Sequence, residues 1–123
     1  MRAQDWRGMV RALRDSGRTH TFSDEDIEKY KEAWSQPGAM TAMLNWYRAA
    51  LWYQPQLTDE MRVRVRTLIL WGVNDNALSR RMARPSLDYC EDGNLIYFPE
   101  ATHWVQHEEA DEVNRHLLQL VLA

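Results

Sequence analysis

The sequence predicts an α/β fold built around a strand–helix–strand unit in the second half of the chain. Two short apolar runs, residues 67–71 and 94–98, have the length and the β-branched or aromatic content of buried strands. The polar segment between them is long enough to hold a crossover helix, which favours parallel pairing of the two strands. Each run leads into a loop with one potentially catalytic group, Asp75 after the first and His103 after the second.

The first part of the chain is predicted to be helical. Residues 2–16 place Trp6 and three further apolar side chains at helical spacing, and Gly17 is a suitable stop. A second helix is expected after Ser23, because Asp26 three residues later completes a capping box. It should end before Pro37, since the residue preceding a proline disfavours the helical region.

A third helix is predicted over residues 39–52. One face of this helix carries a set of mostly apolar side chains: Met40, Met43, Leu44, Tyr47 and Leu51. Tyr47 is therefore expected on the apolar side, where its hydroxyl needs a hydrogen-bond partner. A polar linker over residues 55–60 follows.

The remaining segments complete the second half. Residues 62–66 alternate arginine and valine, which predicts a strand entrance with one wet face. A last helix is expected over about residues 108–122, because Ala110, Val113, Leu117 and Val121 recur on one side that should pack on the sheet. The chain thus divides at about residue 60 into a helical part, residues 1–60, and a strand-containing part, residues 61–123.

Composition limits the function classes. The chain has 123 residues, 45% of them hydrophobic and 27% charged, as in one small globular domain. Its net charge of −3 does not favour a nucleic-acid or anionic-membrane partner. The histidine spacings match no metal site, and no cofactor motif is present. With no apolar run that could span a bilayer and no signal-peptide pattern, a cytoplasmic location is expected.

Two motifs resemble the C-terminal third of an α/β-hydrolase. They are WGVND at residues 71–75 and FPEATHWVQHEEADEVN at residues 98–114, and they look most like the epoxide hydrolase branch. In that branch the loop after strand 7 carries the triad acid and the loop after strand 8 carries the histidine. Asp75 and His103 take those two positions. The resemblance implies the C-terminal portion of an α/β-hydrolase fold, with the N-terminal core strands missing.

A third motif, SQPGAMTAMLNWYRA at residues 35–49, resembles the late cap helix of epoxide hydrolases. The resemblance implies that residues 1–60 form a helical cap segment and residues 61–123 the end of the core. Tyr47 takes the place of the tyrosine that polarises the epoxide oxygen.

The implied chemistry gives each residue a role. His103 would act as the general base towards water, and Asp75 would orient its ring and stabilise the imidazolium. Tyr47 would donate a hydrogen bond to the oxygen on which negative charge develops. Judged from the residues alone, the ordinary alternatives are a polar loop histidine, a turn aspartate and a packed core tyrosine.

The sequence contains no G-x-D-x-G or G-x-S-x-G nucleophile motif and no His-Gly oxyanion dipeptide. We therefore expect an epoxide hydrolase, or a C-terminal fragment of one, that is inactive by itself. Alternatives are a dehalogenase of the same fold and a non-catalytic truncated chain whose partner completes the sheet. The expected ligand is a small apolar epoxide once the core is complete, and the open strand edge could support self-association.

Overall fold

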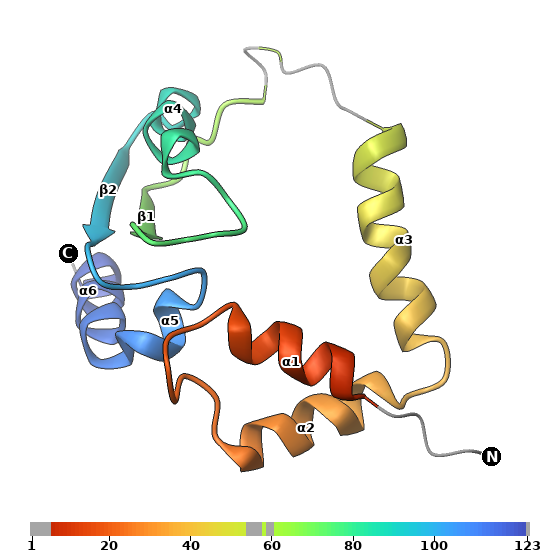
Figure 1. Cartoon of the computed structure of the whole chain (residues 1–123). Helices are drawn as coiled ribbons and strands as arrows, with labels where there is room; N and C mark the ends of the chain where they lie inside the picture. Colours follow the sequence, from red (N-terminus) through yellow and green to blue (C-terminus); the bar gives the residue numbers. More distant parts are fainter. Residues whose placement is uncertain (1–5, 54–57, 59–60, 123) are drawn as a thin grey trace.

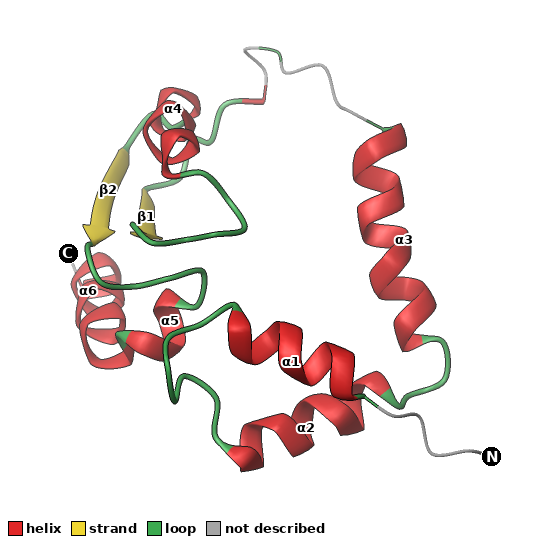
Figure 2. Cartoon of the chain, in the orientation of Figure 1, coloured by secondary structure: helices red, strands yellow, loops and turns green. Residues whose placement is uncertain are grey.

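A pair of parallel strands forms the centre of the C-terminal half (Figures 1 and 2). The computed structural model describes residues 6–53, 58 and 61–122. Strand β1 is Thr67–Gly72 and β2 is Gly93–Phe98, paired in register from Thr67↔Gly93 to Gly72↔Phe98. Both predicted strands and their parallel pairing are confirmed, and each strand is one residue longer than expected. Their carboxyl ends lie at the same edge of the sheet.

The crossover between the strands is helical, as expected, but is broken into short pieces. Helix α4, Ala83–Ser86, lies between two 3₁₀ helices, Arg80–Met82 and Leu87–Tyr89. Pro85 lies within α4 and has no backbone N–H, so it removes one donor from the helical hydrogen bonds of this segment. Ala83 is fully buried.

Helices α1, Arg7–Asp15, and α2, Asp24–Trp34, pack around an apolar cluster. The buried members of this cluster are Leu13, Phe22, Ile27 and Trp34. The capping box predicted at Ser23 is present, with the Ser23 side chain accepting from the Asp26 N–H and the Asp26 carboxylate accepting from the Ser23 N–H. Residues 2–5 of the first predicted helix and most of the predicted linker lie outside the described residues.

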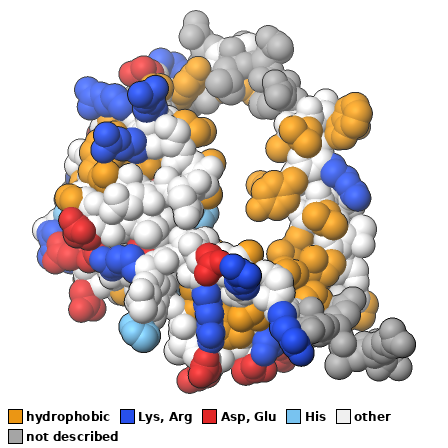
Figure 3. Space-filling model, viewed as in Figure 1, with side chains coloured by type: hydrophobic (Ala, Val, Ile, Leu, Met, Phe, Trp, Pro, Cys, Tyr) orange, Lys and Arg blue, Asp and Glu red, His pale blue; other side chains and the backbone are white. Residues whose placement is uncertain are grey.

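Helix α3, Ala39–Trp52, has the predicted bounds but an uncovered apolar face. Gly38 begins it in the left-handed region, at φ 81°, which allows the tight turn from α2. Figure 1 shows α3 standing across from the strands, and Figure 3 shows a hollow between them with hydrophobic side chains on the α3 side. Met40 packs against the α1–α2 cluster, whereas Met43, Leu44, Tyr47 and Leu51 are 42–76% exposed.

The C-terminal helix differs from the prediction. Instead of one helix from about residue 108, the chain forms a short helix α5, Val105–Glu108, and then α6, Ala110–Leu122. The break falls where Arg18 binds both the Glu108 carbonyl and the Glu109 carboxylate. Of the predicted sheet-facing side chains only Val113 is buried, beside Phe98 and Ala101.

The predicted strand entrance at residues 62–66 is also only partly formed. Val63 makes a single parallel bridge to Cys90, and the side chains of both Val63 and Val65 remain exposed. The expected division into a wet and a dry face is therefore wrong, because all five residues from Arg62 to Arg66 are exposed. In the described part of the chain, no helix has the length and apolar character needed to cross a membrane.

The open face of α3 predicts self-association. Replacing Leu44 and Leu51 together by glutamate, as Leu44→Glu with Leu51→Glu, should lower ANS binding and shift sedimentation towards the monomer, because charge is introduced into the exposed apolar stripe. The matched control is Ala42→Glu with Ala49→Glu, which has the same spacing on the opposite helix face. A native chain that sediments as a monomer without binding ANS would contradict the prediction.

Candidate active site

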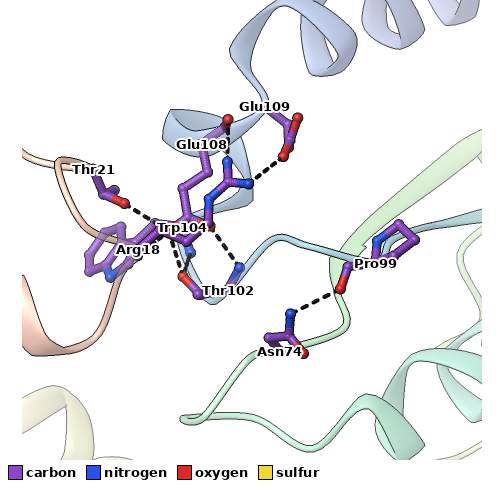
Figure 4. A network of polar contacts seen from close by, with 8 residues as sticks. All are labelled: Arg18, Thr21, Asn74, Pro99, Thr102, Trp104, Glu108 and Glu109. Carbon is purple, nitrogen blue, oxygen red and sulfur yellow. Dashed lines mark hydrogen bonds and ion pairs between the residues drawn. The ribbon is translucent and has the colours of Figure 1, made fainter.

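Backbone hydrogen bonds join the loop after β1 to the loop after β2. The Val73 N–H donates to the Phe98 carbonyl at 3.0 Å, and the Asn74 N–H donates to the Ala101 carbonyl at 2.9 Å. The Asn74 side chain adds a bond from Nδ2 to the Pro99 carbonyl at 2.9 Å (Figure 4). These contacts bring together the two loops that carry the predicted acid and histidine.

Gly72 allows these loops to approach closely. A Cβ atom at this position would lie 1.9 Å from the Thr102 carbonyl oxygen and 2.7 Å from that of Ala101. Both neighbours are backbone atoms, so a side chain could be accommodated only by moving the loop. The glycine of the WGVND motif is thus required by the backbone that precedes His103.

Asp75 lies in this turn with both carboxylate oxygens engaged. Oδ1 accepts from the backbone N–H groups of Ala77 and Leu78 at 2.8 and 2.9 Å, and Oδ2 lies 2.9 Å from His103 Nδ1. The side chain is only 8% exposed. Burial raises the pKa of Asp75, but the hydrogen bonds from Leu78, His103 and Ala77 outweigh burial and hold the pKa below its usual range.

His103 meets Asp75 as the sequence predicted. Its side chain is 37% exposed, and its ring packs edge-on against Trp104 with centroids 5.4 Å apart. A carboxylate at Nδ1 favours the tautomer with the proton on Nδ1, which leaves the Nε2 lone pair available to accept a proton. Trp104 is held in turn by a bond from its Nε1 to Ser16 Oγ and by an edge contact with Phe22.

Tyr47 is not brought to this pair. It lies on α3 and is 69% exposed, and the described residues include no hydrogen-bond partner for it. The predicted apolar side of the helix has no packed core against it, since Met43, Leu44, Tyr47 and Leu51 are all exposed. Within the described residues the arrangement is therefore a histidine in contact with a buried carboxylate, and Tyr47 lies on a different element.

Sequence reasoning missed the buried carboxylate of Glu108, whose side chain is 1% exposed and contacts Thr102, the neighbour of His103. The available signal was an acidic residue five positions after the histidine, followed by a helix. Among the described residues no group of histidine, cysteine and carboxylate side chains could hold a metal ion.

The architecture is that of the C-terminal portion of an α/β-hydrolase fold. A product complex of a Bacillus megaterium epoxide hydrolase variant superposes on the whole chain with a TM-score of 0.80, at 20% identity and covering 46% of that structure. A serine hydrolase involved in carbazole degradation matches 94% of this chain and 46% of its own, with a TM-score of 0.71 at 21% identity. At these identities the likeness establishes the fold alone.

Sequence relatives are epoxide hydrolases and an AB hydrolase. The chain is 40% identical over 123 residues to the AB hydrolase superfamily protein YfhM of Bacillus subtilis, covering 97% of this chain and 41% of that protein. It is 34% identical over 117 residues to Epoxide hydrolase 2 of Caenorhabditis elegans, covering 94% and 32%. The chain thus spans less than half of these relatives and matches their C-terminal parts. No family model matches the chain.

We expect Gly72→Ala to disrupt the site. The added Cβ would collide with the Thr102 carbonyl, so the loop would move and the variant would lose about 3 kcal/mol of stability. Thermal melts and the His103 ring signals in NMR spectra measure both effects. Gly8→Ala is the control, because among the described residues no heavy atom beyond its chain neighbours and its own helix backbone lies within 4 Å of its Cβ position. A Gly72→Ala variant as stable as the native chain would contradict this account of the motif.

The lowered pKa of Asp75 predicts acid sensitivity. The unfolded chain binds more protons than the folded chain between the folded-state pKa of Asp75 and its ordinary value of 3.8. The stability contributed by Asp75 is therefore complete above that value and is lost as the pH falls through the lower, folded-state pKa. Thermal melts between pH 6 and pH 2 should show a shallower acid decline in Asp75→Asn than in Asp88→Asn, an exposed control. Equal declines would refute the assignment.

Proposed function

We propose that this chain supplies the general base and its orienting acid to an epoxide hydrolase of the α/β-hydrolase fold. The observation that carries the proposal is the 2.9 Å contact between His103 Nδ1 and the buried Asp75 carboxylate, at the carboxyl ends of two parallel strands. In open α/β sheets this edge is where catalytic groups collect. The sequence relatives named epoxide hydrolases support the same reaction class.

In this proposal the reaction has two stages. An aspartate from outside this chain attacks an epoxide carbon, the ring C–O bond breaks, and an ester to the substrate forms. His103 then takes a proton from water through Nε2, and the resulting hydroxide attacks the ester carbonyl. The acyl C–O bond breaks, the proton of the hydroxide goes to the released oxygen, and the aspartate is restored as a carboxylate. The imidazolium proton goes to the alkoxide formed in the first stage, which completes the diol. Asp75 holds the Nδ1 proton and stabilises the imidazolium formed in that step.

In this proposal Tyr47 acts as a hydrogen-bond donor in addition to the nucleophile, His103 and Asp75. A phenol that donates to the ring oxygen stabilises the negative charge that develops as the C–O bond breaks. Its exposure on α3 leaves the hydroxyl available to a substrate bound beside this helix. We accordingly assign residues 1–60 to the cap and residues 61–123 to the end of the core, with a small apolar epoxide between them.

A chimera tests this function. The C-terminal region of C. elegans Epoxide hydrolase 2 that matches this chain is replaced by residues 1–123, so that the remaining part of that protein provides the rest of the sheet. We expect diol formation from an aryl epoxide. His103→Ala should lower kcat on the order of 10⁶-fold and Asp75→Asn on the order of 10⁴-fold.

Two controls make the result interpretable. The 123-residue chain alone should show no turnover, since none of its motifs supplies a nucleophile. His20→Ala, an exposed histidine far from Asp75 in the sequence, should leave the chimera active. A folded chimera without hydrolase activity, or one unaffected by His103→Ala, would overturn the proposal and favour a non-catalytic chain that binds a partner.

A further inference from the structure

Glu108 is a buried carboxylate with four hydrogen-bond donors around it (Figure 4). Oε1 accepts from the Arg18 N–H at 2.7 Å and from the hydroxyls of Thr21 and Thr102 at 2.8 Å each. Oε2 accepts from the Thr102 N–H at 2.7 Å. The Arg18 guanidinium lies 3.6 Å from the same oxygen, and its Nη2 donates to the Glu108 carbonyl at 2.6 Å.

This environment keeps Glu108 ionised. Burial raises the pKa of its carboxyl, but the backbone N–H groups of Thr102 and Arg18 and the two threonine hydroxyls together hold the pKa below its ordinary range. An ionised carboxylate that is buried needs all of its donors, because each donor lost leaves charge without compensation. The carboxylate of Glu108 and its four donors therefore fix each other's positions.

Two of these donors belong to Thr102, the residue immediately before His103. Its N–H and its hydroxyl bind Glu108, while its carbonyl lies directly over Gly72, where no Cβ could fit. The peptide that leads into His103 is thus fixed on one side by the buried carboxylate and on the other by β1. This fixes the point from which the imidazole extends towards Asp75.

We propose that Glu108 is a positioning residue that holds the His103 loop so that the imidazole stays bonded to Asp75. The assignment deepens the proposed function and rests on it, since His103 is taken there as the base. It also gives the segment between α1 and α2 a role at the site, because Arg18 and Thr21 supply two of the four donors. That segment is part of the geometry of a base about eighty residues away in the chain.

Glu109 provides a matched control. Its carboxylate pairs with Arg18 Nη1 at 2.9 Å, and its side chain is 28% exposed. It carries the same charge, adjoins Glu108 and shares Arg18 as a partner, but makes none of the hydrogen bonds to Thr102. A change seen in Glu108→Gln and not in Glu109→Gln therefore reports on the Thr102 connection rather than on lost charge.

The experiment is an NMR titration of the 123-residue chain carrying either substitution. In Glu108→Gln the hydrogen-bonded His103 Nδ1–H signal should be lost. The pKa of Asp75 should rise towards its ordinary value of 3.8, because the contribution of His103 is removed. In Glu109→Gln both readouts should match the native chain. A merely structural glutamate would lower thermal stability without moving the Asp75 titration in the folded variant.

A folded Glu108→Gln chain that keeps the His103 signal and the native Asp75 titration overturns the proposal, as do equal changes in Glu109→Gln. If Glu108→Gln does not fold, the Thr102→Val variant tests the proposal instead, because it removes one hydroxyl donor from Glu108. A smaller shift in the same direction supports the positioning role, and no shift overturns it. Both readouts are independent of turnover. An inactive chimera would therefore contradict the proposed function, but the effect of Glu108 on the contact between His103 and Asp75 could still be measured.

Discussion

The geometry of the site depends on the backbone hydrogen bonds between the two loops at the carboxyl ends of β1 and β2. Val73 and Asn74 donate to Phe98 and Ala101, so the loop with the acid and the loop with the histidine form one unit. Each such bond contributes a net stabilisation of only about 1 kcal/mol. The contact between the partly exposed His103 and Asp75 contributes a stabilisation of no more than about the same size. The contact between Asp75 and His103 is therefore a consequence of how the loops are joined, rather than the force that joins them.

The buried carboxylates of Asp75 and Glu108 lie on either side of His103 and bind different groups. Asp75 binds the imidazole itself, and Glu108 binds the peptide that precedes it. In both cases burial by itself would raise the pKa, and hydrogen bonds that include backbone N–H groups reverse the shift. Backbone donors suit this purpose because they cannot rotate away as side chains can. In the proposed function, the charge that orients His103 is consequently in place before any substrate binds.

The α3 helix shows the opposite situation, in which a side-chain pattern has no local partner. Its stripe of Met43, Leu44, Tyr47 and Leu51 has the spacing of a packed face, yet all four side chains are exposed. The matched relatives are more than twice the length of the region that they share with this chain. An apolar face of this size normally contacts another surface. The exposure from which we predict self-association would also give Tyr47 the access that the proposed chemistry requires.

Local signals in the sequence determined the capping box at Ser23, the bounds of α3 and the two strands, because capping, helical spacing and β-branched runs act within a few residues. They also located Asp75 and His103, since each lies in the loop that follows one of those strands. Tertiary contacts decided the break at Glu109, the exposure of the α3 face and the burial of Glu108. Arg18 and Thr21 reach Glu108 across some ninety positions of the chain, and no local pattern encodes such a contact. The identity of the acid and of the histidine in each loop is thus determined by local sequence. How firmly each loop is held depends on residues that are distant in the sequence.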